Sequence, residues 1–278
     1  MSASPSELLR RHGLVARKRF GQNFLLAPNV HGKIAAASGA GDNDRIIEIG
    51  AGLGTLTQHL LATGAEVWAI ERDRDLCHVL RHELAEAQRF RLFEGDALKF
   101  DYRGALEGVY GRPIVVGNIP YNITGPLLFR LLEDTDVLGR WILMLQKEVA
   151  DRLCASPGSH SYGAPTITLS RLRDITRICT VPPGAFVPAP KISSAVVRFE
   201  PRAQPRGVPV DPHGFSQLVR AAFRARRKTM QNALAGLASR ERVLGWCELA
   251  NVDPGVRPER VSVEQFTALQ RAREHTHA

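Results

Sequence analysis

Short hydrophobic runs alternate with amphipathic stretches over the first 200 residues of the chain. Most runs are rich in Ile and Val, and the first four end directly before Gly or Glu. Continuous runs of this kind are typical of parallel strands that are buried on both faces. The pattern therefore predicts an α/β fold with a mostly parallel sheet of seven strands. The predicted strands are residues 45–49, 66–70, 90–93, 114–116, 141–145, 174–181 and 194–200.

Amphipathic segments predict helices between these strands, and glycines mark several helix ends. Gly39 and Gly64 each follow a predicted helix, as C-terminal helix caps commonly do. The predicted helices are residues 4–12, 29–37, 55–63, 75–87, 126–132, 146–154 and 166–173.

The end of the chain predicts a second, smaller domain. Pro201–Pro209 has the composition of a linker, and residues 211–278 predict a small helical domain with polar loops at 251–260. A chain of 278 residues is long enough for one large α/β domain and a small second unit. The predicted domains are residues 1–202 and 203–278.

Residues 114–121, with the sequence IVVGNIPY, carry the most specific candidate chemistry. Asn118 and Pro120 follow a predicted strand, at the edge of an α/β sheet where ligands bind, and Tyr121 adds a flat aromatic ring. An amide oxygen and a backbone carbonyl can accept two hydrogen bonds from an exocyclic amine while an aromatic ring stacks on the base. This arrangement suits group transfer to an amine such as N6 of adenine. A strand that ends in an ordinary turn is the more common case for these residues alone.

A glycine-rich turn follows the first predicted strand. The sequence GAGLG (50–54) lies between a strand and a helix, where backbone N–H groups approach a nucleotide. Glu71 follows the next strand, where an acid can bind both hydroxyls of a ribose; its alternative role is that of a solvated acid at a helix start. Because the spacing lacks the gap of a G-x-G-x-x-G fingerprint, adenosine without a pyrophosphate fits better than NAD.

Asp96 follows the third predicted strand and could accept a hydrogen bond from an adenine amine; the alternative is a turn or helix-capping aspartate. The glycine turn, Glu71, Asp96 and Asn118 thus follow four strands of one sheet. Since the carboxyl ends of parallel strands lie at one edge, we expect these features to converge on a single crevice. Such convergence favours a ligand site over four independent turns.

The net charge of +9 comes from the two ends of the chain. Residues 1–20 contain five basic residues and one acidic residue, and residues 201–278 contain thirteen basic and seven acidic residues. Residues 21–200 contain nineteen basic and twenty acidic residues. Basic ends beside a near-neutral middle predict a polyanionic partner. The alternative is a soluble surface in which Arg is frequent because the genome is rich in GC.

The cysteines predict neither a metal site nor disulfides. Cys77, Cys154, Cys179 and Cys247 have no Cys-x-x-Cys spacing and no secretory context, so we expect reduced, mostly buried thiols. No hydrophobic run approaches the ~20 residues of a membrane span. The N-terminus lacks the hydrophobic region of a secretion signal and resembles a transit peptide only loosely. A cytoplasmic protein without membrane contact is therefore expected.

Long segments in a fixed order, from Arg17 to about Phe266, carry a family resemblance. They are KRFGQNFL (18–25), EIGAGLGTLT (48–57), the strand end at Glu71, GDAL (95–98), VGNIPYNITGPLLF (116–129), LMLQKEVADRL (143–153), VPPGAFVPAPKISSAVVRF (181–199) and FRARRKTMQNAL (223–234). In these segments the chain closely resembles the KsgA/RsmA-type ribosomal RNA small-subunit adenine N6,N6-dimethyltransferases, which use S-adenosylmethionine. NIPY is an N-[L/I]-P-Y variant of the motif of amino-methyltransferases.

The resemblance implies a Rossmann-like class I methyltransferase domain over residues 1–202 and a helical RNA-binding domain over 203–278. The implied cofactor-binding residues are Asn23, Leu25, Gly50, Gly52, Glu71, Asp96 and Asn118. Asn118 and the Pro120 carbonyl would accept the N6 hydrogens, Tyr121 would stack on the base, and Phe186 is a second stacking candidate. The candidate phosphate contacts are Arg17, Lys18, Arg19, Arg224, Arg226, Arg227 and Lys228.

The implied activity is dimethylation of two adjacent adenosines near the 3′ end of 16S rRNA, in the small ribosomal subunit or its precursor, by a monomer. A large-subunit rRNA methyltransferase of the macrolide-resistance type shares the core motifs, but segments 181–197 and 223–229 favour the small-subunit branch. A non-catalytic assembly factor with this fold is a second alternative, disfavoured by the intact glycines, Glu71 and NIPY. A nicotinamide dehydrogenase is disfavoured by the glycine spacing.

Overall fold

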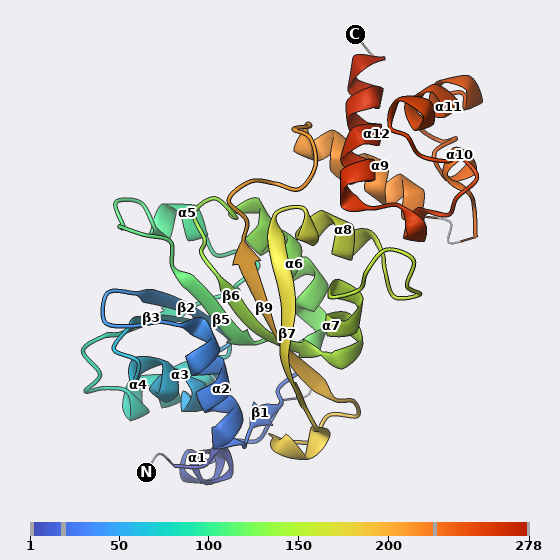
Figure 1. Cartoon of the computed structure of the whole chain (residues 1–278). Coiled ribbons are helices and arrows are strands. Elements are labelled where there is room, and N and C mark those ends of the chain that lie inside the picture. Colours follow the sequence, from blue (N-terminus) through green and yellow to red (C-terminus); the bar gives the residue numbers. More distant parts are fainter. Residues whose placement is uncertain (1–2, 18–20, 225–226, 277–278) are drawn as a thin grey trace. The chain divides into compact units, whose positions relative to one another are not determined.

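A seven-stranded sheet in the order β4-β3-β2-β5-β6-β9-β7 organises the first part of the chain (Figure 1). The computed structural model describes residues 3–17, 21–224 and 227–276. Neighbouring strands from β4 to β6 are parallel, and β9 pairs antiparallel with β6. The predicted mostly parallel, seven-stranded α/β fold is confirmed. The strands are β2 (Arg45–Ile49), β3 (Glu66–Glu71), β4 (Phe90–Glu94), β5 (Ile114–Asn118), β6 (Trp141–Gln146), β7 (Arg173–Val181) and β9 (Ser194–Pro201).

Helices α2 (Pro28–Ser38) and α3 (Thr55–Leu61) cover one face of this sheet. Ile34 of α2 and Leu60 of α3 are buried against strand residues such as Val116, because every second side chain of a strand points to the same face. Helix α4 (Arg74–Glu83) packs against β3 and β4. The other α-helices that the structure describes before residue 160 are α1 (Pro5–Arg11), α5 (Tyr102–Ala105), α6 (Thr124–Glu133) and α7 (Lys147–Leu153).

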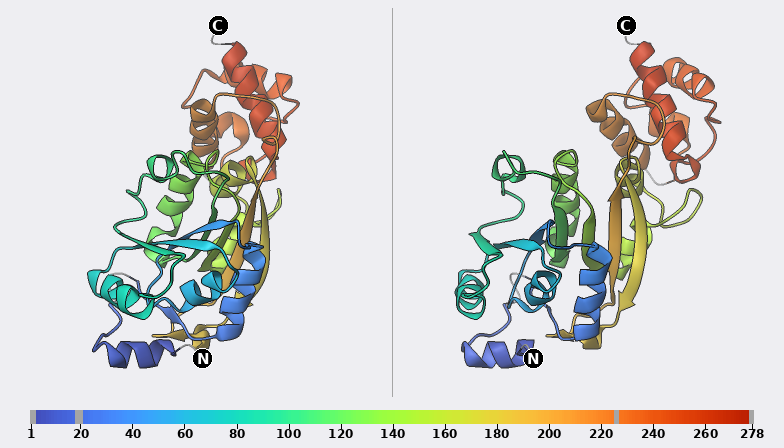
Figure 2. Two further views of the ribbon diagram at one scale, coloured as in Figure 1. Left: turned by 90° about the vertical axis from the view of Figure 1, so that its left-hand side faces the viewer. Right: turned by 60° about the vertical axis from the view of Figure 1, so that its left-hand side comes forward.

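A short antiparallel ribbon joins β1 (Phe24–Leu25) to β8 (Phe186–Val187). The sequence pattern does not predict this ribbon, because two residues per strand are too few to show a period. Leu8 of α1 packs in one cluster with Phe24 and Leu53, so α1 and the ribbon lie at the same end of the sheet (Figures 1 and 2). The ribbon holds the N-terminal segment, by which we mean the described residues up to Leu25, beside the glycine turn that follows β2.

The chain divides into two compact units, Met1–Ala150 with Thr176–Glu200 and Asp151–Ile175 with Pro201–Ala278. The second unit is helical and its core contains the fully buried Trp246. Ile167 belongs to the same core, which explains why residues 151–175 group with the C-terminal helices. Among its described residues, this unit contains the α-helices α8 (Ala164–Ser170), α9 (Pro212–Phe223), α10 (Met230–Ala233), α11 (Arg240–Leu249) and α12 (Val263–His275).

Two helices end three or four residues earlier than the sequence predicts. The helix predicted over 166–173 ends at Ser170, because the chain turns at Leu172, whose carbonyl accepts a hydrogen bond from the Arg202 N–H over 3.0 Å. The helix predicted over 75–87 ends at Glu83, and the following residues turn toward β4. In both places the periodic pattern continues beyond the backbone hydrogen bonds of the helix.

Two global expectations can be compared with the described residues. None of the four cysteines, all of which lie in the described part of the chain, forms a disulfide; Cys77 and Cys247 are buried, Cys179 is partly buried and Cys154 is exposed. Within residues 3–17, 21–224 and 227–276, no helix has the length and the apolar character that a membrane span requires.

Candidate active site

A cavity lies at the carboxyl ends of β2, β3, β4 and β5. It offers about 130 Å³ to solvent-sized molecules, which is roughly ten times the space that one water requires. The structure brings most of the predicted site residues to this cavity, although they are widely separated along the chain. The lining includes Asn23, Gly50, Gly52, Glu71, Asp96, Asn118, Pro120 and Tyr121.

The glycine turn after β2 requires residues without a Cβ atom. Gly50 and Gly52 have φ values of 72° and 62°, which residues with a side chain rarely adopt. A Cβ on Gly52 would also lie 3.4 Å from the ring of Phe24. The backbone can therefore approach a ligand closely at this turn, as the glycine pattern predicts.

Three backbone N–H groups hold the carboxylate of Glu71. Oε2 accepts a hydrogen bond from Gly52 over 2.9 Å, and Oε1 accepts from Arg72 and Asp73, each over 2.8 Å. Burial raises the pKa of Glu71, and the three hydrogen bonds oppose that shift. A carboxylate has about four acceptor positions. The bonds formed among the described residues thus leave one position for a hydroxyl of a ligand.

Asp96 forms a turn and also lines the cavity. Its Oδ1 accepts a hydrogen bond from the Leu98 N–H over 3.0 Å, as turn aspartates do. Its Oδ2 lies 3.3 Å from a guanidinium nitrogen of Arg72, and the residue lines the cavity. The turn and the Arg72 guanidinium together orient the Asp96 carboxylate, which could accept a hydrogen bond from an amine of a ligand.

The N-terminal segment orients the side-chain amide of Asn118. Its Nδ2 donates to the backbone carbonyl of Asn23 over 3.0 Å. Its Oδ1 has no hydrogen-bond partner among the described residues, and Asn118 lines the cavity. The amide therefore offers an acceptor oxygen in the site, as the sequence predicts.

The carbonyl of Pro120 is not the available acceptor that the sequence predicts. It accepts hydrogen bonds from the Ile123 N–H over 3.1 Å and from the Thr124 hydroxyl over 3.4 Å, and these bonds shape the turn η2 (Tyr121–Ile123). Both lone pairs of this oxygen are therefore engaged. The carbonyl of Ile119 has no such partner in the described part of the chain, and Ile119 also lines the cavity. The available carbonyl beside Asn118 is that of Ile119.

The two aromatic candidates have different surroundings. Tyr121 lines the cavity, and its hydroxyl hydrogen-bonds to Oγ of the fully buried Ser194 over 2.7 Å, which fixes the ring. Sequence reasoning missed Ser194, because only the fold brings it to Tyr121. Phe186 is not brought to the cavity: it pairs with Leu25 across the ribbon and is only 4% exposed. Leu25 itself lines a neighbouring cavity of about 40 Å³.

Glu48 lines this smaller cavity near the carboxyl end of β2, and sequence reasoning did not select it. The residue is 1% exposed, and its Oε2 has no hydrogen-bond partner among the described residues. Burial, together with the charge of Glu71, raises the pKa of Glu48 from 4.5 to about 8. The side chain is therefore mostly protonated at neutral pH.

The free energy of unfolding of the unmodified protein is expected to fall as the pH rises, because of Glu48. The Glu48→Gln variant should lack this part of the pH dependence. Folded Glu48 keeps its proton up to about pH 8, whereas the unfolded chain releases it near pH 4.5. The unfolded state then binds fewer protons, so the free energy of unfolding falls by about 1 kcal/mol per pH unit through this window. Urea unfolding of both proteins at several pH values measures the difference in slope.

Buried His31 also makes stability depend on pH, so the effect of Glu48 can be measured by itself only over part of the pH range. Burial and the nearby His59 lower the pKa of His31 from 6.5 to about 4. Between these values the unfolded state binds more protons at His31, so this residue makes stability rise with pH, opposite to Glu48. The comparison therefore belongs between pH 6.5 and 8. Parallel pH slopes for the two proteins there would contradict the assignment to Glu48.

The predicted phosphate contacts in the helical unit are accessible where the structure describes them. Arg224, Arg227 and Lys228 are all exposed and follow α9 closely in the chain. Lys18, Arg19 and Arg226 lie outside the described residues.

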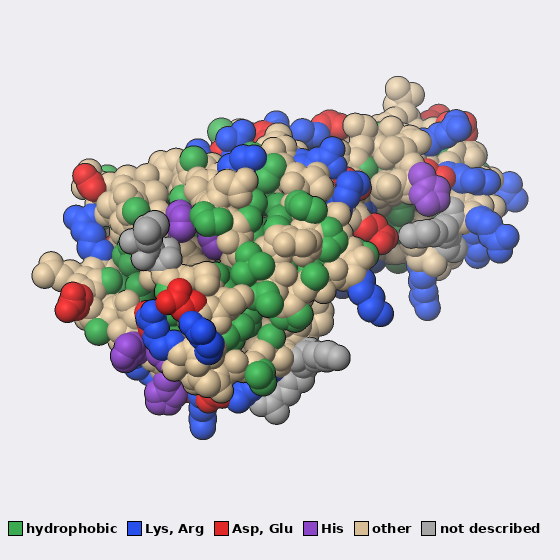
Figure 3. Space-filling model, turned by 90° about the horizontal axis from the view of Figure 1, so that it is seen from below, with side chains coloured by type: hydrophobic (Ala, Val, Ile, Leu, Met, Phe, Trp, Pro, Cys, Tyr) green, Lys and Arg blue, Asp and Glu red, His purple; other side chains and the backbone are tan. Residues whose placement is uncertain are grey.

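Arg17 has a different environment from the one that the sequence predicts. Its guanidinium forms ion pairs with Asp73 and with Asp75, so it is already bound by two carboxylates. On the face of the first unit that Figure 3 shows, acidic and basic side chains are mixed around exposed hydrophobic groups. This face is not uniformly basic.

The description "Ribosomal RNA adenine dimethylase" belongs to the family model that matches residues 13–272 of the chain. A "Ribosomal RNA small subunit methyltransferase A" from Anaeromyxobacter sp. (strain K) is 43% identical over 96% of this chain and 97% of its own. A protein of the same name from Methylococcus capsulatus is 45% identical over 92% of this chain and 97% of its own.

Two solved structures resemble the fold over most of its length. A dimethyladenosine transferase from Plasmodium falciparum has a TM-score of 0.74 and 25% identity, covering 91% of this chain and 98% of that one. The 23S rRNA methyltransferase ErmE has a TM-score of 0.71 and 24% identity, covering 90% of this chain and 99% of that one. The likeness to ErmE shows the fold alone.

Proposed function

The chain belongs to the ribosomal RNA adenine dimethylase family, and we propose that it dimethylates N6 of two adjacent adenosines near the 3′ end of 16S rRNA during small-subunit biogenesis. It is an rRNA adenine dimethyltransferase with the class I methyltransferase fold. One observation carries the proposed chemistry: the available Oδ1 of Asn118 and the available carbonyl of Ile119 line the same cavity as Glu71 and Asp96. Relatives named for the small subunit, at 43% and 45% identity, support that substrate over the large subunit.

The residues around the cavity suit S-adenosylmethionine as the cofactor. Glycines with positive φ give the ligand close access to the backbone, and Glu71 has one acceptor position left for a ribose hydroxyl. Asp96 would accept from the adenine amine, and Asn23 would lie along the methionine part. Leu25 would not contact the cofactor in the larger cavity directly, because it lines only the smaller neighbouring one. When bound, this cofactor supplies a methyl group activated by a sulfonium centre.

The chain's own groups would activate the target amine of the RNA. The lone pair on adenine N6 is delocalised into the ring, which makes the nitrogen a weak nucleophile. We propose that the two N6–H groups donate hydrogen bonds to Oδ1 of Asn118 and to the carbonyl oxygen of Ile119, in place of that of Pro120. Accepting both hydrogens draws the nitrogen toward tetrahedral geometry and localises its lone pair. Fixed dipoles of this kind also stabilise the positive charge that develops on the nitrogen.

Tyr121 would stack on the extruded adenine, since its hydroxyl is fixed by Ser194 and its ring borders the cavity. A second transfer to the same nitrogen requires the pocket to accept a monomethylated amine. No strong base is needed, because the nitrogen becomes positively charged when it receives the methyl group and then releases a proton readily.

The proposed function is tested by methylation of purified ribosomal subunits. The full chain is incubated with radiolabelled S-adenosylmethionine and with each subunit from a strain that lacks these modifications, and the labelled nucleotides are then mapped. Label confined to two adjacent adenosines near the 3′ end of 16S rRNA supports the proposal. Label in 23S rRNA would instead favour the large-subunit activity, and no label in either subunit would favour a non-catalytic assembly role.

Removing the exposed charges after α9 should weaken RNA binding and reduce its salt dependence. In the Arg224→Ala, Arg227→Ala, Lys228→Ala triple variant, we expect the slope of log K against log salt to fall by roughly 2, at about 0.7 per lost phosphate contact. The measurement is fluorescence anisotropy with a 16S rRNA fragment at several salt concentrations.

A matched variant controls for net charge in this experiment. Arg240→Ala, Arg257→Ala, Arg271→Ala removes three exposed cations from the same helical unit. If both triple variants lose the same slope, the cluster after α9 has no special role and only the total charge matters.

A further inference from the structure

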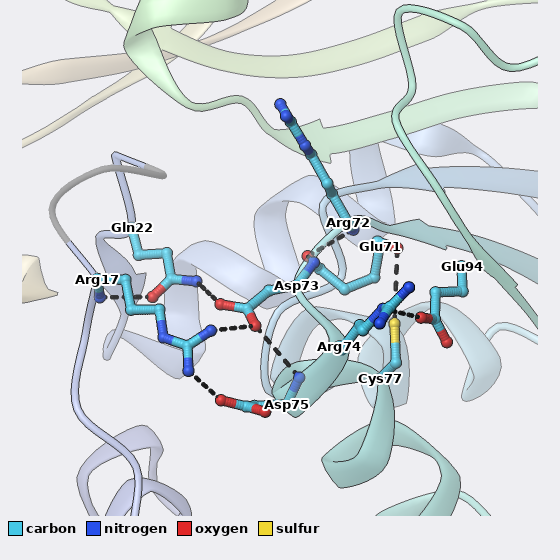
Figure 4. A network of polar contacts seen from close by, with 9 residues as sticks. All are labelled: Arg17, Gln22, Glu71, Arg72, Asp73, Arg74, Asp75, Cys77 and Glu94. Atoms are coloured by element: carbon cyan, nitrogen blue, oxygen red, sulfur yellow. Dashed lines mark hydrogen bonds and ion pairs between the residues drawn. The ribbon is translucent and has the colours of Figure 1, made fainter.

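Two side chains tie the N-terminal segment to the loop that follows β3 (Figure 4). The guanidinium of Arg17 donates to Oδ1 of Asp73 over 2.9 Å and also pairs with Asp75. The amide of Gln22 donates to Oδ2 of Asp73 over 2.8 Å, while its own oxygen accepts from the Arg17 N–H over 2.7 Å. We call Arg17, Gln22 and Asp73 the N-terminal latch.

Asp73 connects this latch directly to the acid that is assigned to the cofactor ribose. Its backbone N–H donates to Oε1 of Glu71 over 2.8 Å, and its side chain caps α4 by accepting from the Asp75 N–H. Glu71 is bound in turn to the N–H of Gly52. One chain of hydrogen bonds therefore links the N-terminal segment, the loop after β3 and the glycine turn, as the sticks in Figure 4 show in part.

The latch also bears on the wall of the cavity. Gly21–Phe24, which include Gln22 of the latch, line the cavity. In the same segment, the carbonyl of Asn23 accepts the hydrogen bond from Asn118. The segment is thus held at two points, by the latch and by Asn118, with the cavity beside it.

Asp73 is a buried acid, and its hydrogen bond with Arg17 joins two charged groups. Asp73 is 4% exposed, whereas the side chain of Arg17 is 37% exposed. Hydrogen bonds between ions are shorter and stronger than neutral ones. Loss of the cation would leave a buried carboxylate short of a partner, which favours movement of the N-terminal segment or of the loop after β3.

We propose that Arg17 is a positioning residue for the cofactor, acting through Asp73, rather than a contact for RNA phosphate. The inference rests on the proposed function in one respect, namely that an S-adenosyl compound occupies the cavity. The latch keeps Gly21–Phe24 and the Glu71 loop in the arrangement that the ligand requires. Weakening the latch lowers the affinity of the protein for the cofactor and leaves its affinity for RNA unchanged.

The test compares cofactor binding and RNA binding in the same variants. Arg17→Gln is expected to raise the Kd of S-adenosylhomocysteine, measured by calorimetry on the full chain, about tenfold, because a charge-assisted bond to a buried acid is lost. The KM for S-adenosylmethionine should rise in parallel while kcat changes little. Arg17→Lys keeps the charge without the fork of donors, so it should give an intermediate Kd.

Three further variants guard against a merely structural effect. Asp73→Asn retains a residue that can cap α4 but removes the charge, and should raise the same Kd. The double variant Arg17→Gln, Asp73→Asn should be no worse than the more affected single variant, since both remove one interaction. Arg74→Gln is the matched control: its side chain is 87% exposed and pairs with Glu94 rather than with the latch, so its Kd should be normal.

Each contrary result has a definite meaning. A normal S-adenosylhomocysteine Kd in Arg17→Gln, with weaker RNA binding and a shallower salt slope, would overturn the inference and restore Arg17 as a phosphate contact. A lower melting temperature with an unchanged Kd and KM would also overturn it, since the role would then be structural. If the unmodified chain bound no S-adenosylhomocysteine, the cofactor assignment itself would fail, together with the inference.

Discussion

Replacing Asn118 by Ala is expected to lower kcat for methyl transfer about 10³-fold, the upper end of the effect of removing one preorganised polar group from an active site. The variant loses Oδ1 of Asn118, an acceptor that has no hydrogen-bond partner among the described residues and belongs to a residue that lines the cavity. RNA affinity should be nearly unchanged, because the proposed phosphate contacts lie elsewhere in the chain. Single-turnover transfer of a radiolabelled methyl group to unmethylated small subunits measures the rate.

Asn29→Ala provides a matched control for this result. Asn29 is an exposed amide on α2, so its removal changes the same chemical group without touching the cavity lining. Near-normal turnover by Asn118→Ala would show that the amide does not hold the target amine, and the proposed mechanism would then have to be abandoned.

Glu71→Gln is expected to raise the Kd of S-adenosylhomocysteine about 100-fold, since hydrogen bonds to charged groups are worth more than neutral ones. The carboxylate accepts three backbone N–H bonds in this structure. An amide has only one oxygen, and its NH₂ group would face an N–H donor of the loop or of the glycine turn. The ribose acceptor and the backbone around it should therefore both be disturbed. Isothermal titration calorimetry measures the affinity.

Glu94→Gln is the appropriate comparison for Glu71→Gln. Glu94 lies directly opposite Glu71 in the register of β3 and β4, but it pairs with Arg74 and Arg81 outside the cavity lining. Its replacement should leave cofactor affinity normal. Equal losses in both variants would mean that Glu71 acts through general stability rather than by holding the ligand.

The glycine turn and the acids at the strand ends were predictable because each depends on local sequence. Hydrophobic runs locate the strands, and parallel strands place their carboxyl ends at one edge, so Gly50, Glu71, Asp96 and Asn118 had to converge. The β1–β8 ribbon was not predictable in this way. Its pairing of Leu25 with Phe186 is a long-range contact with no periodic signal, and it buries the ring that was expected to stack on a base.

Hydrogen-bond partners decided the remaining assignments. Arg17 looks like a phosphate contact in the sequence, yet it pairs with Asp73, which is 56 residues away. Ser194 fixes Tyr121 across 73 residues, and Asn23 orients Asn118 across 95. The choice between the carbonyls of Ile119 and Pro120 depends on a turn that consumes the second of them.

By itself, the sequence determined the class of fold, the order of its strands along the chain, the polar groups at the strand ends and the family. These follow from local periodicity and from motifs whose spacing is independent of distant residues. Only the tertiary structure decided which of those groups remain available to a ligand and which are already bound. A polar side chain can satisfy its hydrogen bonds with any partner that the fold brings near, and that choice is not written in the neighbouring residues.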